Sequence, residues 1–470
     1  MAYNSILKFV FAAVIITIAG SACKKDSFIT SADARLSASV DSVKFDTVFT
    51  SVGSITKSFK INNLNNQKLL LSSVKLMGGT ASPYKINING IAATEAKDIE
   101  IAANDSIYIF VSVTVNPTVA DLPFVLSDSI QIEYNGNKRL VQLQAYGQNA
   151  HFLRDSVVSV NTTFSTDKPY VILGSLTVKK DVTLTLPAGC KIYAHANAPV
   201  LVDGSMISNG TFSNQVIFRG DRLDEDYKDL PASWPGIYFR SSSKNNVLSF
   251  TQILNAYQAV VAYEPSGNSD PKVTLHKCII DNSYDVAIYA VHSSVTAENC
   301  LISNAGSNVK VNFGGEYNFT NCTIASYGNY YIQHKNPVVY MDNYFDDNGT
   351  IQSENLTAQF TNCIMWGEGG IVDDEIAVYK KGSGTVTASV KNCLYKVKTD
   401  PTLITISNSI KNQKPEFDSI DVNRKYYDFR ITLNEAAPGI NAGTVTSYTT
   451  DLDDKPREVT ITDIGCYEKQ

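Results

Sequence analysis

The chain has 470 residues, 44% of them hydrophobic and 18% charged, so it can bury a large core and is not a disordered chain. Its 40 basic and 46 acidic residues leave a net charge of −6. This mild acidity excludes general nucleic-acid binding, because a basic surface supplies most of the affinity for a phosphate backbone.

Residues 1–22 have the pattern of a secretory signal peptide. Lys8 precedes a short apolar run at residues 9–18, and small residues lead up to Cys23. Small residues followed by Cys23 resemble a bacterial lipobox, which implies cleavage before Cys23 and lipidation of that residue. Two or three acyl chains give stable anchoring, so we expect a lipoprotein held in the bacterial outer membrane through Cys23. The alternative is a plain secretion signal with an incidental cysteine.

Residues 23–40 are polar and small, which predicts a flexible lipidated tether. The start of this segment, Lys24-Lys25-Asp26, resembles the charged export tag of surface lipoproteins in Bacteroidetes-type bacteria. That resemblance implies display on the outside of the cell. No later segment approaches about 18 consecutive apolar residues, so the lipid is the expected anchor.

Residues 41–148 predict one β-sandwich. Short strand-like runs alternate with turn signals, and Asn135-Gly136 between two alternating apolar runs favours a β-hairpin. About seven strands in this length suit an Ig-like sandwich. The order of runs and turns resembles Ig-like domains of the Hydin type, which implies a spacer or adhesion module.

A repeat centred on a cysteine recurs within residues 150–430. Cys278, Cys300 and Cys322 are 22 residues apart, and Cys363 and Cys393 follow in the same local pattern. A period near 22 with strand-forming residues predicts a parallel β-helix, since the signature of a leucine-rich repeat is missing. We expect these five cysteines to form a reduced, inward-facing stack, with disulfides as the competing interpretation.

The alternation of apolar residues shifts phase just before each of these cysteines, which indicates a bend. Asparagine tolerates the left-handed backbone that such a bend favours, and its amide can bond to the asparagine of the next coil. The sequence therefore predicts a ladder formed by Asn299, Asn321, Asn362 and Asn392.

Strand-and-turn units of the same kind begin earlier, between Gly174 and Gly220. Residues 150–470 resemble right-handed parallel β-helix proteins of the pectate-lyase-like type, including surface lipoproteins of Bacteroidetes. The predicted fold is thus all-β: an Ig-like β-sandwich followed by a right-handed parallel β-helix of about 12 coils. Residues 431–470 resemble the closing segment called choice-of-anchor Q, which we expect to cap the open end of the stack.

Four charged residues of this closing segment predict a structural cluster of ion pairs and turns, with cation binding as the alternative. They are Asp451, Asp453, Arg457 and Asp463. The remaining cysteines, Cys190 and Cys466, lie in turn-like contexts without an obvious partner.

No nucleophilic triad and no His/Cys metal pattern occurs in the sequence, and no metal site is predicted. Loop carboxylates are the catalytic candidates, because neighbouring coils of a solenoid can place two of them at the separation that glycoside hydrolysis requires. They are Asp221, Asp224, Glu225, Asp226, Asp373 and Asp374. The resemblance implies Ca²⁺ as cofactor if the protein is a polysaccharide lyase.

Tyrosines are the candidates for binding, since aromatic rings stack on the apolar faces of sugars. Five fall within about one coil of chain: Tyr327, Tyr330, Tyr331, Tyr340 and Tyr344. Five more are spread over other coils: Tyr238, Tyr257, Tyr263, Tyr284 and Tyr289. The favoured hypothesis is a surface-anchored protein that binds extracellular polysaccharide without catalysis. The alternatives are a polysaccharide lyase or glycoside hydrolase, and an envelope scaffold or adhesin.

Overall fold

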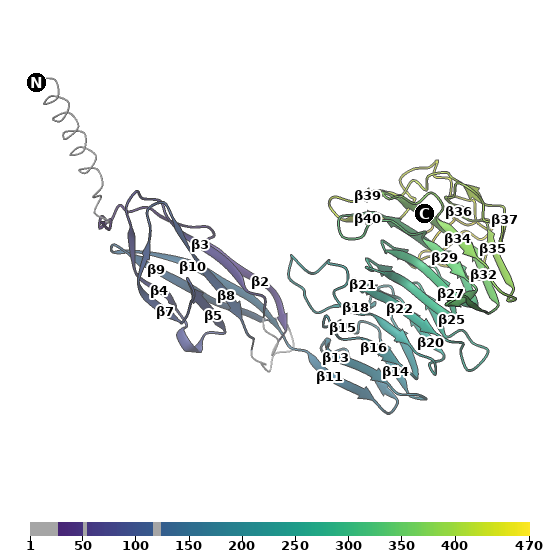
Figure 1. Cartoon of the computed structure of the whole chain (residues 1–470), viewed down its shortest axis with the longest axis horizontal. Helices are drawn as coiled ribbons and strands as arrows, with labels where there is room; N and C mark the ends of the chain where they lie inside the picture. Colours follow the sequence, from purple (N-terminus) through teal and green to yellow (C-terminus); the bar gives the residue numbers. More distant parts are fainter. Residues whose placement is uncertain (1–26, 50–53, 116–123) are drawn as a thin grey trace, which may run out of the picture. The chain divides into compact units, whose positions relative to one another are not determined.

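The computed structural model describes residues 27–49, 54–115 and 124–470 (Figure 1). These residues form an all-β protein with two compact units, which divide between Asn149 and Ala150. The predicted signal peptide and the predicted lipidation residue Cys23 lie outside the described residues. Within the described ranges, no helix is long and apolar enough to cross a membrane.

The first unit has two five-stranded sheets around one apolar core, in the orders β1-β3-β8-β5-β6 and β2-β10-β9-β4-β7. A hairpin at Asn135-Gly136 joins β9 to β10, and both turn residues have the positive φ that this turn needs. The strands are β1 (Leu36–Ala38), β2 (Ser42–Phe49), β3 (Lys57–Asn63), β4 (Leu69–Leu76), β5 (Tyr84–Ile88), β6 (Ile91–Ala92), β7 (Glu95–Ile101), β8 (Ser106–Val113), β9 (Phe124–Tyr134) and β10 (Asn137–Gln148).

The first unit begins before residue 41, which corrects the predicted extent of the tether. Strand β1 pairs with β3, and Phe28 forms a β-bridge with Lys68. Ala34 and Leu36 are buried in the core of the unit. Ile29 and Ala38 pack against the same core, so apolar burial fixes this segment although most of its residues are small or polar.

The second unit is one 26-stranded sheet whose strands stack in three parallel ladders, which the chain visits in the order C, A, B until β34, the last strand of ladder A (Figure 1). This arrangement is consistent with a parallel β-helix. Ladder A contains parts of β11 (His151–Val158), β13 (Tyr170–Val178), β25 (Val286–Glu298) and β27 (Ser307–Thr320), with β16 (Val200–Val202), β19 (Ile237–Phe239), β22 (Gln258–Tyr263), β29 (Val339–Asp342) and β34 (Ile376–Tyr379).

Strands β25 and β27 continue from ladder A into ladder B. Ladder B also contains β12 (Thr162–Thr163), β14 (Thr183–Pro187), β17 (Ser205–Asn209), β20 (Asn246–Ser249), β23 (Val273–His276), β32 (Leu356–Thr361), β35 (Val386–Lys391) and β37 (Ile404–Ser407). Ladder C contains the first parts of β11 and β13, with β15 (Lys191–Ala194), β18 (Val216–Gly220), β21 (Thr251–Leu254), β24 (Ile279–Asp281), β26 (Leu301–Ser303), β28 (Thr323–Tyr327), β33 (Ile364–Glu368), β36 (Leu394–Tyr395) and β38 (Ile410–Lys411). Two hairpins stand apart: β30 (Tyr344–Asp347) with β31 (Thr350–Ser353), and β39 (Ser419–Asp421) with β40 (Tyr426–Asp428).

The bend between ladders B and C holds the five repeated cysteines. Their thiols are free and buried, and the Cys278 N–H donates to Cys300 Sγ at 3.4 Å. The residue before each cysteine has a positive φ: Lys277 50°, Asn299 51°, Asn321 52°, Asn362 53° and Asn392 52°. The left-handed bend that the phase shift predicts is therefore present in these coils.

The C-terminal segment lies along the side of the stack, which corrects the prediction that it caps the open end. Thr444 N–H donates to Asn362 Oδ1 at 2.9 Å, and Arg457 Nη2 donates to Asn299 Oδ1 at 2.8 Å. The segment thus reaches across several coils at the bend between ladders B and C. The segment takes this position because ladder C has apolar side chains on its outer face as well as on its inner face. A sheet that is apolar on both faces must be covered on both.

One apolar cluster joins the outer face of ladder C to the C-terminal part of the chain. It includes Leu301, Ile364, Trp366 and Leu394 from the ladder, with Phe429, Leu452, Ile464 and Cys466 packed against them.

The charged residues of the C-terminal segment form ion pairs and hydrogen bonds with their neighbours. Arg457 pairs with Glu468 at 2.9 Å, Asp453 pairs with Arg430 at 2.8 Å, and Asp451 and Asp463 accept backbone N–H groups.

Candidate functional site

Seven exposed or half-buried tyrosines lie on the outer face of ladder A or in the turns that lead into its strands, and we call their surface the tyrosine face. Its rings are Tyr238, Tyr257, Tyr263, Tyr284, Tyr289, Tyr340 and Tyr379. The strand register places Tyr238, Val261, Tyr289, Lys310 and Tyr340 in one line across consecutive coils. Neighbouring positions in such a line are about 4.8 Å apart.

The rings of the tyrosine face contact one another in pairs. The ring centroids are 6.0 Å apart for Tyr257 and Tyr284, 6.4 Å for Tyr263 and Tyr289, and 5.5 Å for Tyr340 and Tyr379. Tyr257 and Tyr284 are 44% and 50% exposed. The rings therefore form a packed layer that still presents ring surface to solvent.

Burial within this layer fixes the inner rings. Val261 occupies the outer position between Tyr238 and Tyr289, and it is nevertheless fully buried. Burial raises the pKa of Tyr238 and of Tyr289, so both phenols stay neutral at physiological pH. A neutral, fixed ring with a hydroxyl at its edge offers both stacking and hydrogen bonding.

Polar groups lie beside the rings. Lys310 Nζ is 5.6 Å from the centre of the Tyr289 ring, a cation–π distance. Asp342 accepts hydrogen bonds from Asn312 Nδ2 at 2.6 Å and from the Tyr340 hydroxyl at 3.2 Å. Lys310, Asn312 and Tyr340 also line a pocket of about 280 Å³. The face thus combines aromatic surface with charged and amide groups that can orient a ligand.

The structure disperses the five tyrosines that the sequence places together. Tyr327 is buried, which corrects its assignment as a stacking residue, because it packs in the apolar cluster under the C-terminal segment. Tyr330 is 92% exposed and meets Tyr331 edge to face. Tyr344 lies in the β30–β31 hairpin under Lys381, and Tyr340 belongs to the tyrosine face. Closeness in sequence misled here because one coil turns from ladder C through a loop to ladder A and on to the β30–β31 hairpin, so neighbours in sequence lie on different faces.

The six candidate carboxylates belong to two loops at the same corner of the stack. One loop joins β18 to β19 and the other precedes β34, about 24 Å apart for five coils at about 4.8 Å each. The structure does not bring the two sets together. Their closest partners are His195 for Asp221 (2.7 Å), Arg222 for Asp224 (2.7 Å), Lys228 for Glu225 (2.7 Å), Lys398 for Asp373 (3.8 Å) and the Lys398 N–H for Asp374 (2.7 Å).

Glu225 and Asp226 line a pocket of about 330 Å³, to which Asp229, Asp281 and Arg424 also contribute. Burial raises the pKa of Asp281, and its carboxylate accepts hydrogen bonds from Ser303 Oγ and Asn304 Nδ2. Asp281 escaped the sequence analysis, since it follows a core strand and has no motif around it. Only the β-helix register places it opposite the long loop.

The asparagine bend forms a partial ladder. Asn362 Nδ2 donates to Asn321 Oδ1 at 2.8 Å, while Asn299 Oδ1 accepts instead from Arg457. Asn392 makes no side-chain hydrogen bond with another described residue. The side chains at this bend therefore mainly hold the C-terminal segment, which is a structural role.

In the part of the chain that the structure describes, no group of three or more His, Cys, Asp or Glu side chains could hold a metal ion. Ca²⁺, the ion that the resemblance implies for a lyase, takes six to eight oxygen ligands.

No protein-family model and no curated protein matches the chain. Several solved structures match parts of it, among them the following three, each with a TM-score of 0.18. A family 123 glycoside hydrolase from Clostridium perfringens, studied for glycolipid glycan hydrolysis, is 8% identical over 26% of this chain and 30% of its own. The PapD-like domain 7 of human CEP192 is 9% identical over 27% of this chain and 92% of its own. A protein of unknown function from Porphyromonas gingivalis W83 is 9% identical over 26% of this chain and 59% of its own. At this TM-score the similarities carry no argument about fold or function.

Proposed function

We propose that this protein binds extracellular polysaccharide on its tyrosine face, without catalysis, while anchored to the bacterial outer membrane. The observation that supports this most is the line across five coils that contains Tyr238, Tyr289, Lys310 and Tyr340, with Val261 as its one apolar side chain. A polymer that runs along the stack would meet a ring or a polar group of this line at four of the five coils.

Binding on such a face follows from the chemistry of sugars and rings. A pyranose has an apolar face that stacks on an aromatic ring, and its hydroxyls take hydrogen bonds from groups at the edge. The rings are already packed against one another, so little side-chain entropy is lost on binding. Such preorganisation favours affinity without any group that must react.

The test is retention of purified protein on a panel of immobilised neutral and acidic polysaccharides. We expect Tyr289→Ala to weaken retention on the bound polysaccharide at least about tenfold, as loss of a central ring does in binding sites. Tyr330→Ala is the matched control, because that ring is exposed but lies outside the tyrosine face. Equal retention of the two variants, or no retention of the parent on any polysaccharide, would leave a scaffold or adhesin as the better reading.

A second candidate function, glycoside hydrolysis, is favoured by the pocket of Glu225, Asp226 and Asp281. Asp281 has the raised pKa that suits a general acid, and the exposed carboxylates of the long loop stand on the opposite wall. Incubation with the same polysaccharides, with Ca²⁺ and with chelator, tests it. New reducing ends that disappear in Asp281→Asn would establish an enzyme; chelator-sensitive unsaturated products would indicate a lyase.

We also propose the finer assignments that the sequence suggests: right-handed winding of the coils, an Ig-like first unit and lipidation of Cys23. The two five-stranded sheets support the Ig-like assignment. The lipobox pattern supports the anchor. Expression in a bacterium of the Bacteroidetes type should place the parent chain in the outer-membrane fraction and Cys23→Ser in the soluble fraction, and equal partition would contradict the anchor.

A further inference from the structure

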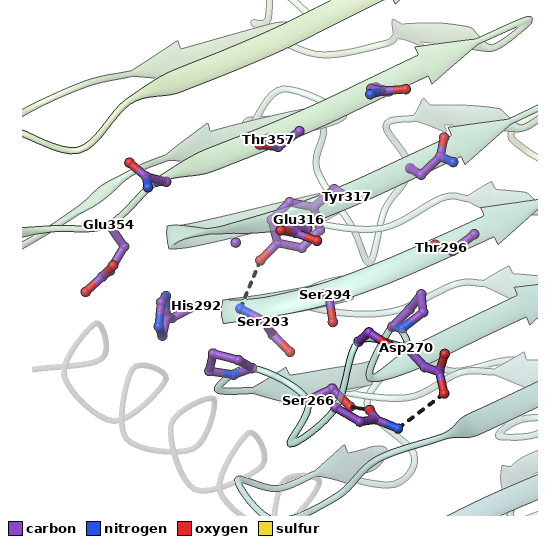
Figure 2. Close-up of a pocket in the computed structure, with 18 residues that line it drawn as sticks. Ser266, Asp270, His292, Ser293, Ser294, Thr296, Glu316, Tyr317, Glu354 and Thr357 are labelled. Carbon is purple, nitrogen blue, oxygen red and sulfur yellow. Dashed lines mark hydrogen bonds between the residues drawn. The ribbon is translucent and has the colours of Figure 1, made fainter.

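A polar groove of about 550 Å³ lies on the outer face of ladder B, and none of the residues of the tyrosine face lines it (Figure 2). Its floor comes from successive coils in β25, β27 and β32. The register aligns these side chains in two rows, Ser294-Glu316-Thr357 and Thr296-Asn318-Gln359. The floor therefore presents hydroxyl, amide and carboxylate groups at the coil spacing of about 4.8 Å.

One wall of the groove is the loop between β22 and β23, and a buried lysine holds this loop. Lys272 is fully buried, and its Nζ donates to the carbonyl oxygens of Arg240 (3.0 Å), Ser241 (2.9 Å) and Tyr263 (2.6 Å). These bonds tie both ends of the loop to the stack. The wall therefore stands in a fixed place, with Asp270 on it.

Three carboxylates give the groove its charge. Asp270 belongs to the wall, Glu316 to the floor and Glu354 to the opposite rim (Figure 2). No lysine or arginine lines the groove, and within the described ranges none of the three carboxylates forms an ion pair. Other exposed carboxylates of this unit do, as Asp346 with Lys381 at 3.0 Å. Desolvation by a neutral or anionic ligand would cost free energy here, so the groove favours a cation.

One end of the groove holds polar groups without partners. Ser293 is 2% exposed, and its hydroxyl has no hydrogen-bond partner among the described residues. Nδ1 of the neighbouring His292 is likewise buried and unpaired in that part of the chain. A buried polar group without a partner is costly, and a ligand hydroxyl would supply one.

The other lining residues favour a sugar over a peptide as the ligand. An extended peptide binds to the free edge of a sheet or inserts apolar anchors into pockets. This floor is the face of a sheet, and its outward side chains are serine, threonine, asparagine, glutamine and glutamate. Such a surface suits a ligand rich in hydroxyls.

We propose that this groove is a second binding site, for an oligomer of an amino sugar with free amines. Its ammonium groups would pair with Glu316, Asp270 and Glu354, and its hydroxyls would bond to the rows of the floor and to Ser293. The proposal stands on the groove alone and does not depend on the tyrosine face.

The test is calorimetric titration of the purified protein with a glucosamine hexamer and with its N-acetylated counterpart, which keeps the backbone but lacks the charge. We expect the glucosamine hexamer to bind, with the acetylated one at least about tenfold weaker. Glu316→Gln, an exposed and nearly isosteric change, should weaken binding of the glucosamine hexamer by a similar factor. Asp347→Asn, an exposed carboxylate outside the groove, is the control and should bind as the parent does.

Equal affinity for the two hexamers, no binding of the glucosamine hexamer, or full binding by Glu316→Gln would each overturn the proposal. Tyr289→Ala separates it from the function proposed above. If Tyr289→Ala abolishes binding of the glucosamine hexamer while Glu316→Gln keeps it, the ligand sits on the tyrosine face and the groove proposal fails. If Tyr289→Ala leaves this binding intact, the groove acts on its own.

Discussion

Arg457 joins the C-terminal segment to the stack through a buried set of polar contacts. Its buried guanidinium pairs with Glu468 at 2.9 Å and donates to Asn299 Oδ1 and to the Gly465 carbonyl, both at 2.8 Å. A buried guanidinium is tolerated only when its N–H groups have acceptors. Removal of the Arg457 side chain would in turn leave the buried carboxylate of Glu468 without its charged partner.

We expect Arg457→Leu to lower the free energy of unfolding of the second unit by about 3–5 kcal/mol, because Glu468 stays buried without its partner. Urea unfolding followed by circular dichroism measures the change. Combining Arg457→Leu with Glu468→Leu should recover much of the loss. If the double variant is no more stable than the single one, the unpaired charge is not the cause.

His276 predicts a pH dependence at the same bend. Its Nδ1 is 2.5 Å from Glu298 Oε2, and that contact raises the pKa of His276 above its ordinary 6.5. A raised pKa in the folded state contributes stability that is complete below pH 6.5 and is lost as pH rises through the raised value. The difference in Tm between the parent and His276→Gln should therefore be larger at about pH 5.5 than at about pH 8.5. A difference that does not change with pH would contradict the pairing.

At the scale of elements, the bend between ladders B and C has two requirements that substitutions can separate. Asn362 needs a left-handed backbone, and its side chain exchanges bonds with Asn321 and Thr444. Asn392 has the same backbone conformation without those bonds. The first requirement applies at both positions, and the second only at Asn362, which touches the C-terminal segment.

We expect Asn362→Ala to cost about 2–4 kcal/mol, from backbone strain of about 1 kcal/mol and the loss of buried hydrogen bonds of about 1 kcal/mol each. Asn392→Ala should cost only the strain, about 1 kcal/mol. Asn362→Gly should fall between these values, because glycine accepts the backbone and loses the bonds. Urea unfolding of the three variants measures the order, and equal losses at 362 and 392 would contradict it.

These bends were predictable because asparagine and cysteine recur with one local pattern, whatever the loop lengths. The tyrosine face was not predictable in the same way. Tyr238, Val261, Tyr289, Lys310 and Tyr340 share a line, yet their residue types differ and their spacing in sequence varies with the loops. Alternation in one strand indicates which side chains point outward, but only the register between coils shows which of them meet.

At the scale of the whole molecule, the C-terminal segment is part of the second unit's core. Leu301, Ile364 and Trp366 are buried although they lie on the outer face of ladder C. Their sequence reads as ordinary strand, so the position of their cover along the side of the stack could not be predicted from it. The resemblance of residues 431–470 to a closing segment predicted that they cover part of the stack, but it did not predict which part.

Removal of residues 413–470 should expose Trp366 and leave Trp234 buried inside the coils. The chain has two tryptophans, so quenching of its fluorescence by acrylamide reports both sites. We expect a single inaccessible class in the parent and a second, accessible class in the shortened chain, together with increased binding of an apolar dye. Trp366→Phe in the shortened chain should remove the accessible class. Unchanged quenching after truncation would mean that other residues cover Trp366.

The position of the C-terminal segment along the side of the stack also sets the order in which parts of the second unit can fold. Arg457 and Asn299 are 158 residues apart, and Lys277 and Asp454, which pair at 2.6 Å, are 177 apart. Coils contact their neighbours early, as local contacts form fastest, whereas these pairings must wait until residues 413–470 have been synthesised. Until then the apolar outer face of ladder C stays exposed to solvent in the nascent chain. A chain that lacks residues 413–470 can therefore stack its coils and still remain a target for chaperones and proteases.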